Sequence, residues 1–156
     1  IRQWFDGPVA LSGAIATGDA VLAAQAMGAD FAYIGSPFIA TVEANADEGY
    51  KNGIVEGKAA DIVYSNLFTG VHGNYLRGSI ERAGLDPDNL PQGDYKTMNF
   101  GQNSNGEPAK AKAWRDIWGS GQGIGAVQKV ETVAERIDRM EREYNAARAR
   151  LQLSAA

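Results

Sequence analysis

Cysteine is absent from this 156-residue sequence. Without thiols the chain can form no disulfide framework, no thiolate zinc site and no cysteine nucleophile. A reducing, cytoplasmic location is the simplest expectation that follows, and we predict no metal site.

A surplus of basic charge and long apolar runs are missing as well. The 19 acidic and 15 basic residues leave a net charge of -4, which argues against nucleic-acid binding driven by phosphate neutralisation. No run approaches the roughly 18 to 20 apolar residues that a bilayer crossing requires, and residues 1–4 lack the order of a signal peptide. We therefore expect a soluble chain with no nucleic acid and no membrane among its partners.

The composition that remains is that of an ordinary globular protein, with 44% hydrophobic residues. Its 19 glycines gather among small and polar residues rather than in repeats, so we expect them to shape turns and sites.

The N-terminal part of the sequence predicts a strand, a helix and a second strand. Two short apolar runs, 8–12 and 31–35, have the size of strands that are buried on both faces. Between them, residues 19–27 are strong helix formers, and Gly28 is placed to end the helix. The whole pattern has the length of one right-handed parallel crossover.

Beyond this unit the periodicity weakens, and Gly, Asn, Asp and Pro recur over a loop-rich middle third. Residues 38–44 are predicted to start a short helix after a favourable proline. Within the middle third and just after it, the sequence predicts helices at 46–56, 74–83 and 109–118 and a short strand at 61–64.

A long helix is predicted near the C-terminus. Thr132 and Glu135 have the spacing of a capping box ahead of a helix that reaches about Leu151. Apolar residues spaced three and four apart predict one apolar stripe along it: Val130, Val133, Ile137, Met140, Tyr144, Ala147 and Leu151. A surface helix packed on its own domain explains this stripe, and a helix-mediated homodimer is the alternative.

Two glycine-containing turns, at 12–14 and 35–36, directly follow the two predicted N-terminal strands. In a parallel sheet both turns lie at the same carboxyl edge. Backbone N–H groups freed there, with the helix that opens after Ser36, form an anion site that suits a phosphate monoester. Eightfold βα barrels bind phosphate at this edge, after strands seven and eight. Plain turn-forming glycine would explain the pattern equally well.

Four stretches resemble the C-terminal half of the nitronate monooxygenase (2-nitropropane dioxygenase) family, in matching order and spacing. They are Leu11–Gly18, Met27–Thr41 with Glu43-Ala44, Phe68–Gly70 and Gly121–Gly125. The resemblance implies an α/β fold, the C-terminal part of a TIM (βα)8 barrel that supplies the last two strands, with a loop-rich helical cover and a long C-terminal helix. It also implies FMN as the cofactor.

The resemblance further implies which residues bind the cofactor. Ser12, Gly13 and Ala14 would form the first phosphate loop, and Gly35 and Ser36 would form the second. Gln122 would lie in the segment that approaches the flavin. The family commonly has two successive glycines where this chain has Gly13-Ala14, and frequently Thr at the position of Ser36. Both changes keep the backbone donors.

No catalytic residue is assigned, because the family's proposed base is a histidine from an earlier strand. His72 lies in a polar turn and is interpreted as facing solvent or bonded within its loop. Tyr64, Asn74 and Arg77 could line the substrate side, although Tyr64 is more typical of a packed aromatic and Arg77 of an ion pair on a helix surface.

We divide the chain into residues 1–45, the last βα units with the phosphate loops; residues 46–125, the cover over the flavin; and residues 126–156, the C-terminal amphipathic helix. Two strands cannot close a barrel, so we expect these residues to be part of a larger protein. A compact rearranged fold is the alternative.

The function implied is that of an FMN-dependent nitronate monooxygenase, which oxidises alkyl nitronates with O2. NADH:quinone reductases and flavin-dependent enoyl reductases share this half of the barrel and are the alternative. The expected partner is a small-molecule substrate: a nitronate, or NADH and a quinone. Two further classes stay open, a non-flavin barrel enzyme that grips a sugar phosphate and a helical interaction module built on residues 126–151.

Overall fold

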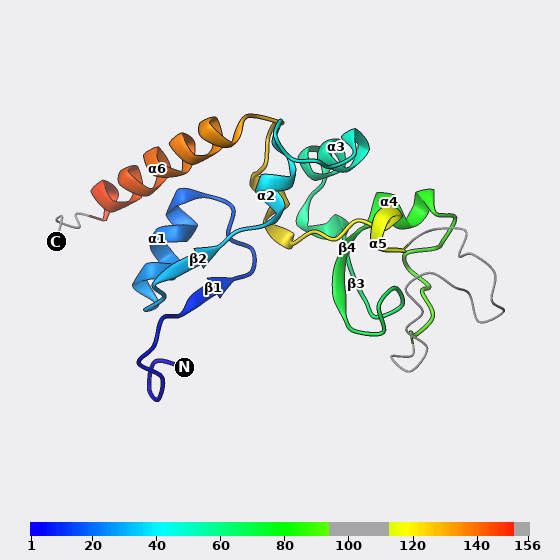
Figure 1. Cartoon of the computed structure of the whole chain (residues 1–156), viewed down its shortest axis with the longest axis horizontal. Coiled ribbons are helices and arrows are strands. Elements are labelled where there is room, and N and C mark those ends of the chain that lie inside the picture. The colour runs from blue at the N-terminus through cyan, green and yellow to red at the C-terminus, as the bar shows by residue number, and fades with distance from the viewer. Residues whose placement is uncertain (94–112, 152–156) are drawn as a thin grey trace.

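A computed structural model describes residues 1–93 and 113–151 (Figure 1). It is a mixed α/β structure with two side-by-side parts. One part contains the two N-terminal strands, the helix between them and the long C-terminal helix. The other contains a β-hairpin and the helices of the cover. Among the residues described, no helix combines the length and the apolar character needed to cross a membrane.

The predicted strand–helix–strand unit is confirmed. It consists of β1 (Ala10–Ser12), α1 (Gly18–Ala26) and β2 (Phe31–Tyr33), and the two strands pair in parallel. The Thr17 hydroxyl caps α1 by accepting a hydrogen bond from the Ala20 N–H at 3.4 Å. After α1 the chain turns at Gly28, whose φ of 92° favours a residue without a side chain. The two strands therefore end side by side, at one edge of a two-stranded sheet.

The two faces of this sheet differ. Leu11 and Ala32 are half-buried on one face, while the register places Ala10 opposite Phe31 and Ser12 opposite Tyr33 on the other. Phe31 and Tyr33 are 63% and 68% exposed. The sheet thus has one open apolar face and two unpaired edges within the described part of the chain.

The predicted helix at 38–44 begins earlier and is shorter than expected. The structure has a single turn, α2 (Ser36–Ile39), with Pro37 in its first turn. Pro37 has the fixed φ that suits a helix start, so it lies inside the first turn and the helix begins at Ser36, before the proline. The next helix, α3 (Glu48–Glu56), confirms the prediction for 46–56, and the Asp47 carboxylate caps it by accepting from the Gly49 N–H at 2.8 Å.

A β-hairpin replaces part of a predicted helix. The strand expected at 61–64 is present as β3 (Ile62–Ser65), but it pairs antiparallel with β4 (Gly73–Leu76), where the start of a helix was expected. Helix α4 (Arg77–Arg82) follows directly. The prediction of a helix from residue 74 was wrong for its first turn, because pairing with β3 overrides local propensity.

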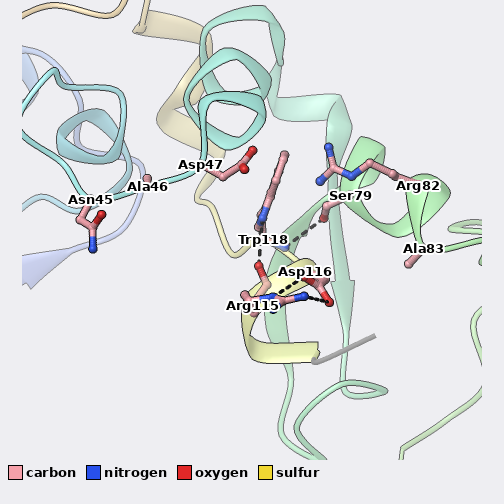
Figure 2. A pocket seen from close by; sticks show the side chains of 9 residues that line it. All are labelled: Asn45, Ala46, Asp47, Ser79, Arg82, Ala83, Arg115, Asp116 and Trp118. Carbon is pink, nitrogen blue, oxygen red and sulfur yellow. Dashed lines mark hydrogen bonds and ion pairs between the residues drawn. The ribbon is translucent and has the colours of Figure 1, made fainter. Parts of the chain in front are cut away.

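The core of the cover surrounds Trp118. Its ring stacks on Tyr50, with centroids 5.0 Å apart. The Arg82 guanidinium carbon lies 3.7 Å from the centroid of the Trp118 ring (Figure 2). Trp118 belongs to one cluster of buried residues, which includes two neighbours of the cover in sequence, Ala40 and Val127; the other members are Ile54, Leu76 and Ile124. Helix α5 (Ala113–Asp116) leads into this core. The predicted helix at 109–118 and the cover at 46–125 lie partly outside the described residues.

The long helix α6 (Val133–Arg150) has the predicted capping box between Thr132 and Glu135. The N–H and the hydroxyl of Thr132 both donate to the Glu135 carboxylate, and these bonds hold the pKa of Glu135 below its usual value. The apolar stripe predicted from the sequence coincides only partly with the face of α6 that is buried. Met140 and Ala147 are buried, but Ile137 is 48% exposed and Arg136 is buried in its place.

Helix α6 lies against α1 (Figure 1). Gly18 allows this contact, because a Cβ added there would collide with the Met140 carbonyl of α6. The Gly18 N–H also donates to the Glu143 carboxylate at 2.8 Å. The open side of the sheet is therefore the side opposite α1 and α6.

Candidate functional site

A cavity of about 230 Å3 lies where β1 and β2 end. Four segments line it: the loop after β1, the loop after β2, strand β4 of the cover and the glycine loop, by which we mean residues 119–125. The glycine loop runs from α5 back toward α2 and so passes between the two parts of the molecule (Figure 1). The lining residues are Ser12, Gly13, Ile15, Tyr33, Gly35, Ser36, Pro37, Asn74, Gly121, Gln122 and Gly123.

The structure brings the predicted cofactor-binding residues together around this cavity. Five of them line it: Ser12, Gly13, Gly35, Ser36 and Gln122. The sixth, Ala14, does not line it, but its carbonyl oxygen lies against the glycine loop, 2.8 Å from the position of a Cβ added at Gly123. The parallel register of the two strands explains why turns so distant in sequence meet at one place. That these residues bind a cofactor stays a prediction.

The cavity offers backbone donors. Within the described part of the chain, the N–H groups of Ser36, in the lining, and of Ala14, next to the lining residue Gly13, donate to no acceptor. Gly13 has a φ of 140°, and no atom lies within 4 Å of a Cβ added there. The loop after β1 is thus free to approach a ligand with its backbone.

The Ser36 hydroxyl connects the second loop to the glycine loop. Its oxygen accepts a hydrogen bond from the Gly121 N–H at 2.9 Å. Because this bond uses a lone pair of the oxygen, the hydroxyl proton stays available for donation to a ligand. Ser36 can therefore donate both its backbone N–H and its hydroxyl while it holds the glycine loop in place.

No charged side chain lines the cavity among the described residues. Neither a carboxylate that would repel an anion nor an ammonium or guanidinium group that would neutralise one is present in the lining. The electrostatics of the site therefore come from backbone N–H dipoles and neutral hydroxyl and amide groups, which is an arrangement known from phosphate-binding turns.

Of the other residues that the sequence placed near the substrate or the flavin, some line the cavity and some do not. Asn74 lines the cavity, whereas Arg77 donates to both oxygens of Asp88 on the surface, at 2.9 and 2.7 Å. His72 stacks on the exposed ring of Tyr64, with centroids 4.7 Å apart, and neither of them lines the cavity. The interpretations of His72 as a loop residue and of Arg77 as an ion-pair residue are confirmed. Tyr64 is not the packed core aromatic that the sequence favoured.

A larger cavity of about 920 Å3 is lined by Trp118 and by residues of the cover (Figure 2). Arg82 and Arg115 border it, and Arg115 donates to the Asp116 carboxylate at 2.8 Å. The Ser79 hydroxyl donates to the Leu76 carbonyl at 2.7 Å, so it holds the wall of the cavity together. None of the predicted cofactor-binding residues lines this space.

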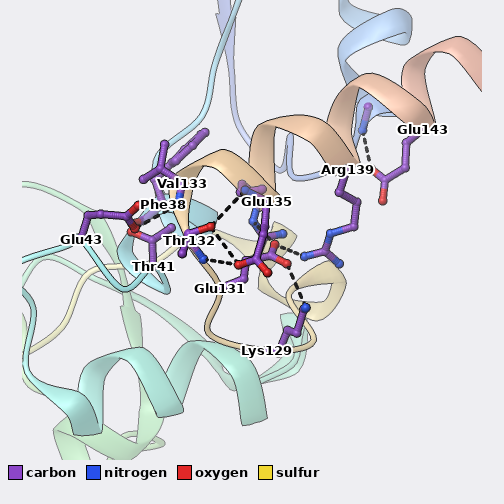
Figure 3. A network of polar contacts seen from close by, with 12 residues as sticks. Phe38, Thr41, Glu43, Lys129, Glu131, Thr132, Val133, Glu135, Arg139 and Glu143 are labelled. Carbon is purple, nitrogen blue, oxygen red and sulfur yellow. Dashed lines mark hydrogen bonds and ion pairs between the residues drawn. The ribbon is translucent and has the colours of Figure 1, made fainter.

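A buried ionic cluster fastens the chain that follows the glycine loop (Figure 3). The Glu131 carboxylate pairs with Arg136 at 2.8 Å, with Arg139, and with Lys129 at 3.7 Å. Burial lowers the pKa of the Arg136 guanidinium, and the neighbouring positive charge of Arg139 lowers it further. The Glu131 carbonyl accepts from the Val42 N–H at 3.0 Å, which joins this cluster to the segment after α2.

Glu43 completes this connection by accepting a hydrogen bond from the Val133 N–H at the start of α6, at 3.0 Å. The segment after β2 and the start of α6 are thus joined twice, through Glu43 and through Glu131. The chain that follows the Gly35-Ser36 turn is consequently held against the start of α6.

Comparison with known proteins places this geometry in context. No protein-family model matches the sequence. A nitronate monooxygenase from Paraburkholderia phytofirmans is 27% identical over 143 residues, which are 87% of this chain and 37% of that protein. A probable nitronate monooxygenase from Staphylococcus saprophyticus is 29% identical over 131 residues, 81% of this chain and 36% of that protein. The chain spans little more than a third of the length of these relatives.

Two solved structures share the fold. A nitroalkane oxidase from Streptomyces ansochromogenes superposes with a TM-score of 0.68 at 24% identity, over 96% of this chain and 42% of its own. FabK from Thermotoga maritima superposes with a TM-score of 0.65 at 22% identity, over 95% of this chain and 47% of its own. At these identities the likeness establishes the fold alone, and it confirms the predicted partial TIM barrel.

The resemblance that the sequence motifs predicted is confirmed by the related sequences. Over most of its length, this chain is similar to a part of proteins named nitronate monooxygenase.

Proposed function

We propose that this chain provides the cofactor-phosphate site of an FMN-dependent oxidoreductase that oxidises alkyl nitronates with O2. The observation that carries the proposal is the meeting of two phosphate-type loops at one cavity, with unpartnered backbone N–H groups in both. The names of the related sequences supply the reaction. We propose residues 1–45 as the phosphate-binding unit, 46–125 as the cover and 126–156 as the helix that supports both.

The residues present fit the phosphoryl end of FMN. A phosphate monoester carries up to two negative charges and several acceptor oxygens. The N–H and hydroxyl of Ser36 in the lining, and the N–H of Ala14 beside it, are neutral donors. At about 230 Å3 the cavity is smaller than the roughly 300 to 1,000 Å3 of sites that enclose whole small molecules. The flavin ring would therefore extend out of the cavity, past the carboxyl ends of the strands.

When bound, the flavin supplies the electron-transfer chemistry, which the protein itself lacks. The role of this chain is to hold the phosphate and to fix the orientation of the rest of the cofactor. No histidine or carboxylate lines the cavity in the described part of the chain. We therefore assign no proton-abstracting group to it.

The first test is to extract the cofactor from the intact protein and identify it by mass. FMN is the expected result, and a colourless protein would support a sugar-phosphate enzyme instead. The matched variant is Ser36→Asp, which places a carboxylate against the phosphate. At an effective dielectric constant near 20, two unit charges about 4 Å apart repel by about 4 kcal/mol. Flavin retention should be abolished, and unchanged flavin content in this variant would refute the site.

The second test separates the reactions. Oxygen uptake with an alkyl nitronate, in the absence of NADH, is expected for the proposed function. Rapid bleaching of the flavin by NADH under anaerobic conditions, with no turnover of the nitronate, would instead support a quinone or enoyl reductase.

A further inference from the structure

Asn74 reaches the cavity from the cover and not from the sheet. It lies on β4, opposite Tyr64 in the hairpin, and lines the cavity together with Gly13 and Ser36. Its side-chain amide makes no hydrogen bond with any residue that the structure describes, although the residue is half-buried. A polar group in this position has its donors and its acceptor free for a ligand.

The backbone fixes where Asn74 stands relative to the second phosphate loop. The Ser120 N–H donates to the Asn74 carbonyl at 3.1 Å, and the next amide along the chain, that of Gly121, donates to the Ser36 hydroxyl at 2.9 Å. Two consecutive amides of the glycine loop thus hold one residue of the cover and one residue of the sheet. Asn74 and Ser36 are therefore kept at a fixed separation on two walls of one cavity.

We infer that the Asn74 side-chain amide donates a hydrogen bond to the phosphoryl group held in this cavity. The inference rests on the proposed function, since it takes the ligand to be FMN. The volume of about 230 Å3 admits the phosphoryl end and not the whole flavin, so a residue that lines the cavity meets that end. Asn74 adds a neutral donor opposite the two backbone loops, and no carboxylate in the described lining competes with it.

A hydrogen bond from Asn74 to the phosphoryl group would also connect the two parts of the molecule through the ligand. The sheet loops hold the phosphate from one side, and Asn74 holds it from the β3–β4 hairpin. The bound phosphoryl group then joins the cover to the sheet through the ligand, in addition to the Ser120 and Gly121 hydrogen bonds.

The test compares FMN with riboflavin, which lacks the phosphate, in the intact protein freed of its cofactor. Loss of a hydrogen bond to a charged group typically weakens binding by about 10-fold or more. Asn74→Ala should therefore weaken FMN binding by about 10-fold or more and leave riboflavin binding unchanged within about threefold. Asn74→Asp should weaken FMN binding further, because its carboxylate repels the phosphate. Asn52→Ala, at an exposed position of α3, is the control and should change neither ligand.

If Asn74→Ala lowers the affinity for FMN and for riboflavin equally, or lowers neither, the inference is overturned. If Asn74→Ala does not fold, the nearly isosteric Asn74→Asp makes the same comparison, and FMN loss with retained riboflavin binding is again required. If the unsubstituted protein takes up no FMN, the proposed function fails, and the inference fails with it. If Ser36→Asp abolishes FMN binding while both Asn74 variants bind FMN normally, the inference alone is wrong.

Discussion

A single methyl group added at Gly123 tests whether the glycine loop must press against the first phosphate loop. The Cβ of Gly123→Ala would lie 2.8 Å from the Ala14 carbonyl oxygen, 3.0 Å from the carbonyl carbon and 3.2 Å from the Ala16 Cβ. Ordinary van der Waals contact begins near 3.4 Å. Two of the three neighbouring atoms belong to the backbone, so no side-chain rotation relieves the clash. One of the two segments must move.

The cost of this movement can be estimated from overpacking in protein interiors, which is typically about 1 to 3 kcal/mol. If the strain is relieved by separating the two loops, it appears as lost cofactor affinity of roughly 5- to 150-fold. The assay is titration of the cofactor-free protein with FMN, read by flavin fluorescence, together with thermal unfolding of the unliganded protein.

The matched control is Gly125→Ala, two residues along the same loop, where no atom lies within 4 Å of the added Cβ. This variant should bind FMN as the unsubstituted protein does. Equal FMN affinity in the two variants would refute the reasoning, because it would show that contact between the glycine loop and the first phosphate loop does not matter for binding.

Three further predictions concern the scaffold around the site. Glu131→Gln removes the carboxylate that pairs with Lys129, Arg136 and Arg139, so chemical denaturation should show a free energy of unfolding lower by about 3 kcal/mol or more. A decrease below about 1 kcal/mol would contradict the importance given to the cluster. Gly18→Ala should destabilise the protein by about 1 to 3 kcal/mol because its Cβ meets the backbone of α6, whereas Gly78→Ala, in open space on α4, should stabilise it by about 0.5 kcal/mol. Finally, the Thr132 donors lower the pKa of Glu135 in the folded state. Their contribution to the free energy of unfolding is therefore fully present above the usual pKa of 4.5 and is lost as the pH falls through the lowered pKa. In Glu135→Gln, the free energy of unfolding should fall less steeply as the pH is lowered through this range.

The sheet and the long helix could be predicted because their signals are local. Short apolar runs and a glycine-terminated helix specify the β1–α1–β2 unit, and a capping box specifies the start of α6. The buried face of α6 could not be read from apolar spacing alone. Arg136 takes a buried position because Glu131, from outside the helix, lies there to pair with it.

The hairpin shows where local reasoning fails. Gly73–Leu76 carries no strong alternation, and it becomes a strand because Ile62–Ser65 lies beside it. The same limit applies to the site. The convergence of the turns at 12–14 and 35–36 follows from parallel pairing of neighbouring strands and was predicted. The place of Asn74 in the cavity depends on the hairpin and on the Ser120 amide.

The open face of the β1–β2 sheet has a thermodynamic consequence for cofactor binding. Covering the exposed parts of Phe31 and Tyr33, at about 25 cal/mol per Å2 and 150 to 250 Å2 per ring, would contribute about 5 to 8 kcal/mol. Tyr33 is also the last residue of its strand and borders the cavity, so whatever packs on this face constrains the loop that leads to Ser36. Occupancy of the face and cofactor affinity should consequently be linked, each strengthening the other by an equal factor. Substitutions on the packing partner, far from any ligand atom, should then lower the affinity for FMN.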